Sequence, residues 1–319
     1  MPMKIPEPIL RILIAALVIL LPAAAWAQSC SFGVSGMSFG QVDTLSGAQT
    51  SSTATMSVNC SGTPLARILI CPNLGTGSGG ATASARQMLS GSNILNYQLY
   101  SDSARSVVWG AYFWPYPARA PALALTLGVL GTGSGSATVY GAILGSQGTV
   151  PPGSYLSTFS SSHVEFRYLY TTSSSCGTGT GTIARPSFNV AATVAANCLV
   201  GTQDVDFGPK GVLSDNVDAT GQVSVTCTPG TTYTVGLSNG LTGTAPTTRR
   251  MTLGTQAVTY GLYRDANRSQ SWGNTVGTNT VAGTGGGTAQ NLPVYGRVPP
   301  QATPSPGVYT DTVVVTVTY

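Results

Sequence analysis

Charged side chains are scarce in this chain: Asp, Glu, Lys and Arg make up 8% of its 319 residues, against roughly 25% in ordinary soluble proteins. Enzymes gather titratable groups at one site, and the only histidine is His163. No nucleophile elbow, HExxH or phosphate-binding loop motif occurs. The scattered basic residues leave no footprint for nucleic acid. We therefore expect no enzyme, no nucleic-acid partner and no catalytic residue.

Metal-binding spacings are missing as well, because no C-x-x-C pair occurs and one histidine cannot complete a typical zinc site. We expect no metal and no cofactor. Long apolar runs are absent beyond the first residues. Lys4 and Arg11 give a basic start, Ile12 to Leu21 is a short apolar run, and Ala25-Trp26-Ala27 fits a cleavage site. A membrane-spanning helix needs about 20 apolar residues, so residues 1–27 are interpreted as a secretion signal.

Helical periodicity is also missing after this segment. The apolar residues instead alternate with polar ones in short runs separated by Gly, Ser, Asn and Pro, as half-buried strands require. The clearest runs are Thr53 to Cys60, Arg67 to Pro72, Leu95 to Tyr100, Val223 to Cys227, Thr232 to Leu237 and Thr312 to Tyr319. The predicted fold class is all-β, with a sandwich as the expected architecture.

One stretch of sequence occurs twice without a gap, at Arg86 to Gly110 and at Arg249 to Gly273. The shared pattern is Y-x-L-Y-x-D-x-x-R-S-x-x-W-G, and every matched pair is offset by 163 residues. So long a period indicates two tandem copies of a whole domain. We expect domains at residues 28–185 and 186–319.

Some repeated residues are better explained by structure than by function. Asp102 and Arg105 recur as Asp265 and Arg268, which favours an ion pair that fixes a turn in each copy. The repeated tryptophans, Trp109 and Trp272, are interpreted as core anchors because aromatic side chains bury the most area.

Six cysteines in an exported chain predict disulfides. Two of them in each copy occupy matching places, so each such pair most simply closes within its own copy. The remaining two lie in the first copy and should pair with each other. The expected bridges are Cys30–Cys60, Cys71–Cys176 and Cys198–Cys227.

On these residues the chain resembles the spore coat protein U domain family. The matching features are a Cys followed by Phe39-Gly40, an S-V-x-C run ending at Cys60, the repeated pattern above, and a closing P-G-x-Y run at Tyr155 and Tyr309. The resemblance implies subunits of archaic (Csu-type) chaperone–usher pili, with immunoglobulin-like domains that lack a last strand. It also implies three partners: a periplasmic pilus chaperone, an outer-membrane usher, and a next pilin subunit that donates a strand to residues 198–319.

Two features favour a position at the pilus tip on the cell surface. Cleavage would leave only Gln28 and Ser29 before the first cysteine, whereas a donor strand needs about five to ten residues. The last motif run of the second copy closes at Tyr319. After the first copy, by contrast, Phe188 to Val194 alternates strictly. That segment either completes the first domain or begins the second, and both readings stay open.

The first copy carries extra sequence. From Trp109 to Tyr140 is 31 residues, against 23 between the matching residues of the second copy. The added segment is aromatic, and contiguous exposed aromatics mark contact sites; a lid folded over the core is an equal alternative. Two apolar residues of a later loop are further candidates. The predicted surface-binding residues are Tyr112, Phe113, Trp114, Tyr116, Leu144 and Val150.

The sequence thus predicts a two-domain tip adhesin that attaches to hydrophobic abiotic or host surfaces and supports biofilm formation. A structural pilin or coat subunit without an adhesive role remains an alternative. So does a carbohydrate-binding tip lectin, which would need a concave site with convergent polar groups.

Overall fold

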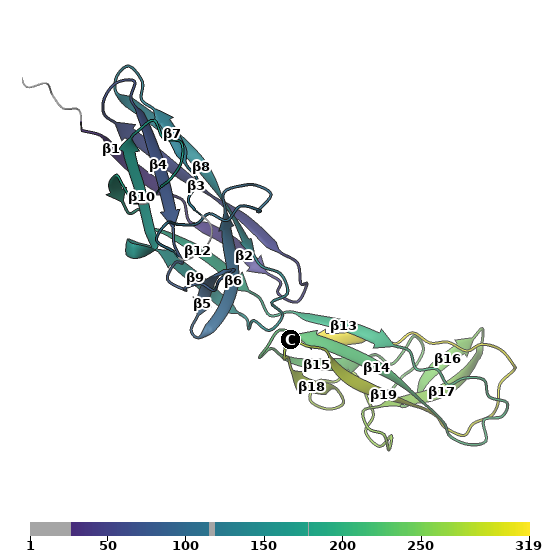
Figure 1. Cartoon of the computed structure of the whole chain (residues 1–319). Coiled ribbons are helices and arrows are strands. Elements are labelled where there is room, and N and C mark those ends of the chain that lie inside the picture. The colour runs from purple at the N-terminus through teal and green to yellow at the C-terminus, as the bar shows by residue number, and fades with distance from the viewer. Residues whose placement is uncertain (1–26, 115–118, 178) are drawn as a thin grey trace, which may run out of the picture.

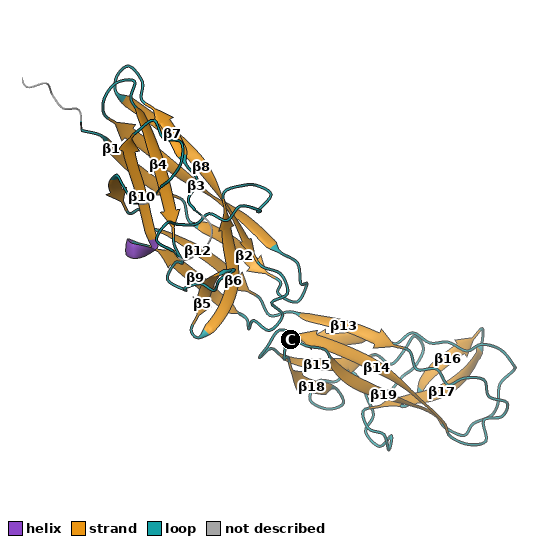
Figure 2. Ribbon diagram, viewed as in Figure 1, coloured by secondary structure: helices purple, strands orange, loops and turns teal. Residues whose placement is uncertain are grey.

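The computed structural model describes residues 27–114, 119–177 and 179–319, and these form an almost purely β structure (Figures 1 and 2). The only helical element among them is a 3-10 turn at Ser161–His163. The chain forms two elongated sandwiches placed end to end, each with its own hydrophobic core. This confirms the predicted all-β class with two domains. The expected signal segment, apart from Ala27, lies outside the described residues.

The first domain, called domain one below, packs a sheet of eight strands against a sheet of four. In spatial order the larger sheet contains β1 (Ser29–Val34), β3 (Thr50–Ser61), β8 (Thr132–Ile143), β6 (Asn93–Tyr100), β5 (Arg86–Ser90), β9 (Gly153–Phe159), β12 (Phe188–Val194) and β2 (Met37–Val42). The smaller sheet contains β11 (Thr182–Ala184), β10 (Val164–Tyr170), β4 (Arg67–Leu74) and β7 (Leu123–Thr126).

The second domain, called domain two, repeats this plan with fewer strands. Its larger sheet contains β13 (Cys198–Gln203), β14 (Val217–Cys227), β19 (Gln290–Val298), β17 (Gln256–Tyr263) and β16 (Arg249–Leu253). Its smaller sheet contains β18 (Val281–Thr284), β15 (Thr232–Leu237) and β20 (Val315–Thr318). Alternation produces the core in both domains: along β14 the residues from Gly221 to Cys227 are buried at every second position.

The alternating segment Phe188–Val194 belongs to the sheet of domain one. As β12 it pairs antiparallel with β9 and parallel with β2, so it lies between them. Its buried residues alternate, and Phe188 stacks on Phe159 with ring centroids 4.6 Å apart. Of the two readings that the sequence left open, the structure therefore selects completion of domain one. We propose a domain boundary between Val194 and Cys198, in place of the one expected at residues 185 and 186.

The repeated tryptophans are core residues, as expected. Trp109 and Trp272 are 1% and 0% exposed, and their indole N–H groups donate to the carbonyls of Pro72 and Val235. Beside each lies a fully buried arginine, whose guanidinium donates to backbone carbonyls, including that of the tryptophan. Those carbonyls accept hydrogen bonds from guanidinium N–H groups that burial would otherwise leave without a partner.

The expected ion pair between Asp102 and Arg105 is wrong. The Asp102 carboxylate instead accepts hydrogen bonds from the amides of Ser106 and Val107, and Asp265 repeats this arrangement. Arg105 donates to the carbonyl of Gly141. The aspartate still fixes the turn, but through backbone amides, which it can reach without ordering a long side chain.

All three predicted disulfides are confirmed: Cys30–Cys60, Cys71–Cys176 and Cys198–Cys227. The first and third join strand neighbours, because Cys30 faces Cys60 across β1 and β3, and Cys198 faces Cys227 across β13 and β14. The second ties the segment after β10 back to β4.

Candidate functional site

The aromatic segment of domain one folds back against the domain. Trp114 is 8% exposed, and the guanidinium of Arg86 lies 4.5 Å from its ring centroid. Ala111 is buried beside it. The lid alternative therefore describes Trp114, and the prediction that it is a surface-binding residue is wrong. The physical reason is the buried Arg86 charge, which gains a cation–π partner when an indole covers it.

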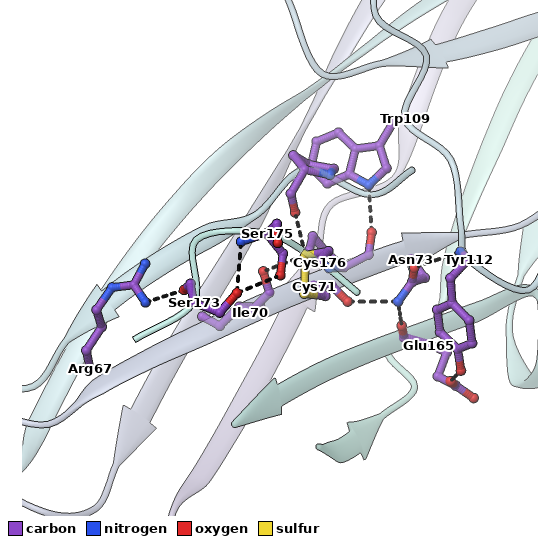
Figure 3. The surroundings of a disulfide bond; sticks show 12 residues. Arg67, Ile70, Cys71, Asn73, Trp109, Tyr112, Glu165, Ser173, Ser175 and Cys176 are labelled. Carbon is purple, nitrogen blue, oxygen red and sulfur yellow. Dashed lines mark hydrogen bonds between the residues drawn. A yellow bond between two sulfur atoms is a disulfide. The ribbon is translucent and has the colours of Figure 1, made fainter. Parts of the chain in front are cut away.

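Tyr112 is likewise engaged. Its hydroxyl donates to the Glu165 carboxylate (Figure 3). The Arg167 guanidinium lies 5.1 Å from its ring centroid. Burial opposes ionisation of Glu165, but hydrogen bonds from Tyr112 and Arg167 and the charges of Arg167 and Arg185 lower its pKa. Phe113 is 39% exposed and is the one outward aromatic of this segment that the structure describes. Tyr116 lies outside the described residues.

A hollow of about 210 Å³ opens beside this cluster. It is lined in part by Asn73, Tyr112 and Arg167 and by the loop that carries Cys176. Ligand pockets usually measure roughly 300–1,000 Å³. The polar groups are also occupied, because Arg167 bonds Glu165 and the carbonyl of Gly179, and Asn73 donates to two carbonyls. This hollow gives the lectin alternative little support.

The two other predicted contact residues, Leu144 and Val150, lie at the end of domain one that adjoins domain two. Val150 is 8% exposed and belongs to the main core of domain one, so the prediction that it contacts a surface is wrong. Leu144 is half-buried. Their loop adjoins domain two: a Cβ built on Gly287 would lie 2.4 Å from the carbonyl oxygen of Gly148. Sequence reasoning could not find this joint, since it depends on how the two domains meet.

The opposite end of domain one carries an apolar surface that the sequence did not single out. We call it the distal pole and define it as the loops at residues 61–66 and 127–131. Leu65, Val129 and Leu130 are 67%, 74% and 81% exposed there. The loops lie side by side, since the amide of Gly62 donates to Gly131 and that of Leu65 to Gly128.

The distal pole points away from domain two (Figure 1). β3 and β8 pair along their whole length, from Thr50 with Ile143 near the joint to Ser61 with Thr132 at the pole. Eleven steps of antiparallel strand span about 37 Å. The repeat leads to the same conclusion. The matching end of domain two, near Gly287, contacts domain one. Because the two domains follow each other end to end in the same orientation, the corresponding end of domain one is not covered by domain two.

The distal pole is held in place by a disulfide and by hydrogen bonds. The Cys30–Cys60 bridge lies beneath it, in a small core cluster that includes Leu127. The hydroxyl of Tyr170 accepts a hydrogen bond from the amide of Thr63. A contact surface that is already ordered loses little conformational entropy when it binds.

A signal for this surface was present in the sequence. Val129 and Leu130 occupy the centre of the turn Gly128–Gly131, which is closed by a bond from the Gly131 amide to the Gly128 carbonyl. Such positions favour Gly, Asn, Asp, Ser and Pro, so two apolar residues between glycines serve no need of the turn. In addition, the first-copy loop is longer: Pro72 lies 12 positions after Cys60, whereas the matching Val235 lies 8 positions after Cys227.

Domain two differs from domain one at the place of β12. In domain one, β12 covers Met37, Phe39, Tyr155 and Phe159, all of which are buried. The matching residues of domain two are only half-buried: Val205, Phe207, Tyr309 and Val313. Among the described residues, no strand lies between the segments that carry them. One side of the core of domain two is thus open.

The fold and these surfaces define a class: a pair of immunoglobulin-like sandwiches, the first complete and the second open along one edge. The chain belongs to the Spore Coat Protein U domain family, whose model matches residues 15–161 and 184–316. It is also 34% identical over 153 residues to "Protein U" of Myxococcus xanthus, an alignment that covers 43% of this chain and 85% of that protein. The match to two segments confirms the repeat.

One of the solved structures that match shares the fold. A chain of the CsuC–CsuE chaperone–tip adhesion subunit pre-assembly complex, from archaic chaperone–usher Csu pili of Acinetobacter baumannii, aligns with a TM-score of 0.54 and 18% identity. The alignment covers 91% of this chain and all of that one. The CupB6 tip adhesin of Pseudomonas aeruginosa aligns with a TM-score of 0.36 and 13% identity, over 92% and 94% of the two chains.

The remaining predictions concern absences. Within the described ranges, no group of three or more His, Cys, Asp and Glu side chains could hold a metal ion. His163 lies at the end of the 3-10 turn and contacts the hydroxyl of Thr76 through Nδ1. No helix in the described part of the chain has the length and apolar character needed to cross a membrane. The family and the fold give no support to an enzyme.

Proposed function

We propose that this protein is the tip adhesin of a chaperone–usher pilus, exported through the periplasm to the cell surface. Domain one attaches the fibre to apolar abiotic or host surfaces, which supports biofilm formation. The observation that carries the proposal is the distal pole: Leu65, Val129 and Leu130 are exposed on two hydrogen-bonded loops at the end of domain one that lies farthest from domain two.

The energy of such a contact can be estimated. Fully burying a Val or Leu side chain is worth roughly 1.5–3 kcal/mol. Since these three side chains are 67–81% exposed, pressing them against an apolar surface would supply about 3–6 kcal/mol before association costs. One contact is weak, but many pili acting together multiply it. Apolar contact also needs no matched hydrogen bonds, so one pole can hold many materials.

The backbone of Leu65 supports a functional role for this residue. It lies in the left-handed region with φ of 63°, which is uncommon for a non-glycine residue and costs about 1–2 kcal/mol. A leucine that is both strained and 67% exposed gains nothing for the fold from its side chain. Contact with an external surface explains why an apolar residue stands here.

Domain two, in this proposal, joins the fibre by accepting a strand from the next pilin subunit, a form of strand addition at an open sheet edge. Before assembly, a periplasmic chaperone would occupy the open edge with a strand of its own. At the outer-membrane usher, the strand of the next pilin subunit would replace that of the chaperone. The open side of the core at Val205, Phe207, Tyr309 and Val313 supports this. So does the fold shared with a subunit that was solved in complex with its chaperone.

The test is a triple variant of the distal pole, Leu65→Asn, Val129→Thr and Leu130→Thr. Asparagine tolerates the left-handed backbone of residue 65, and threonine keeps the shape of valine. We expect pili of normal number and length, and at least a tenfold loss of attachment to polystyrene.

The matched control removes a second apolar triplet of domain one. Leu89, Ile94 and Leu156 are 36%, 42% and 45% exposed and are cross-strand neighbours on β5, β6 and β9. Their replacement by threonine should leave attachment unchanged. If the control triplet abolishes attachment and the pole variant does not, the contact lies on the side of the domain. If neither variant reduces attachment, the result contradicts an adhesive role for these surfaces and favours a structural subunit.

A further inference from the structure

The two domains differ by one segment of chain, and this difference predicts the form of the strand that domain two accepts. This form of the strand rests on the proposed function, in which domain two takes a strand from a partner. In domain one the equivalent place is filled by the domain's own residues 182–194. How that segment runs is therefore a template for the partner of domain two.

The filling segment of domain one has two parts in two different sheets. Its first part, β11, pairs antiparallel with β10, with Tyr168 opposite Thr182 and Phe166 opposite Ala184. Residues 185–187 then cross to the other sheet. The crossing contains Pro186, which has no amide to place in a ladder. The second part, β12, pairs with β9 and β2.

Both places exist in domain two. The strand register shows the first place. Leu74 and Leu237 are equivalent positions of the repeat, and they pair with Val164 and Val315. Val164 therefore corresponds to Val315, and Phe166 to Val317. By the same count Tyr168 corresponds to Tyr319. β20 pairs with β15 on one side, and among the described residues no strand pairs with its other side. This edge matches the one that β11 occupies.

The second place lies between residues 205–210 and 307–313 of domain two. Their counterparts in domain one are β2 and β9, and among the described residues β12 is the one strand that pairs with β2. In domain two neither segment forms a strand apart from one isolated bridge, between Thr310 and Thr252. Because a strand needs a ladder partner for its backbone groups, these segments stay irregular where the β12 counterpart is missing.

We propose that the partner of domain two is a bipartite segment of about 13 residues, which first pairs with β20 and then crosses to lie between residues 205–210 and 307–313. Its second part alternates like β12, with apolar residues at the positions of Phe188, Val190, Ala192 and Val194. The residue at the Phe188 position must be large, because Val313 stands where domain one has Phe159 and leaves more room.

The experiment extends the full chain after Tyr319 by a flexible Gly/Ser linker and a copy of residues 182–194. Thirteen linker residues reproduce the spacing between Tyr168 and Thr182 in domain one. A second fusion carries only the copy of 188–194, on a linker six residues longer. A third carries the long copy with aspartate at the Val190 and Val194 positions. Hydrogen exchange by mass spectrometry and thermal unfolding are measured on all three and on the unextended chain.

The long fusion should protect the amides of both residues 307–313 and residues 316–319, and raise the thermal midpoint of domain two by about 10 °C or more. The short fusion should protect the first region only, and the aspartate fusion neither. If the short fusion protects residues 316–319 as strongly as the long fusion does, the bipartite form is wrong. If the aspartate fusion protects domain two as strongly as the long fusion does, the apolar pattern is wrong. If no fusion protects domain two, strand acceptance itself fails.

Discussion

The bridge between Cys71 and Cys176 is predicted to contribute more to the stability of domain one than the other bridge of that domain. It ties β4 to the loop that leads into β11 and β12 (Figure 3). Without the bridge, that loop is held mainly by the three paired residues of β11 and by hydrogen bonds from Arg67 to Thr171 and Ser173 and from Arg167 to Gly179. We therefore consider the double variant Cys71→Ala, Cys176→Ala in the full chain.

The magnitude follows from the length of the closed loop. The sequence separation is 105 for this bridge and 30 for Cys30–Cys60. The chain-entropy model gives about 4.7 kcal/mol for the long loop and about 3.6 kcal/mol for the short one. Cys71 is 7% exposed, so loss of its sulfur adds roughly 1 kcal/mol of packing. The expected cost of 5–6 kcal/mol is about the whole stability of a marginal domain.

Urea denaturation followed by tryptophan fluorescence would measure this cost. With a slope near 2 kcal/mol/M, the midpoint of domain one should fall by about 2–3 M. The matched control is Cys198→Ala, Cys227→Ala, whose separation of 29 predicts about 3.6 kcal/mol, confined to domain two. A smaller loss of stability in the Cys71, Cys176 variant than in a Cys30→Ala, Cys60→Ala variant measured in the same way would refute this prediction.

Three further outcomes are expected. Trp114→Ala should destabilise domain one by about 2–4 kcal/mol in urea denaturation because it uncovers Arg86, whereas Phe113→Ala should cost under about 1 kcal/mol; equal costs would refute the lid. Glu165 has a lowered pKa in the folded state, so its ionised form stabilises the protein above its ordinary pKa of 4.5, and this stability is lost as the pH falls below that value. Curves of unfolding free energy against pH for Glu165→Gln should lack this loss at acid pH. A curve identical to that of the unchanged protein would contradict the prediction. Trp272→Ala should cost about 3–5 kcal/mol and reduce secretion, measured by immunoblot, and normal export of a stable variant would show that it is no core anchor.

The repeat and the cysteines decided much of this protein without any structure. The alternation of apolar residues is local, so it predicts strands directly. The equivalence of the two copies restricts how the cysteines can pair, because matched residues occupy matched places. These two properties were enough for the all-β class, the two domains and the three bridges.

The contact surface, by contrast, depends on which distant residues meet. Trp114 looked like an exposed aromatic until Arg86 was found beneath it, and Val150 looked like a loop tip until it was found in the core. The distal pole joins two loops that lie about 60 residues apart in the chain, and its outward position follows from the end at which domain two is attached. Burial and pairing of this kind are properties of the assembled sheets, and only the tertiary structure decided them.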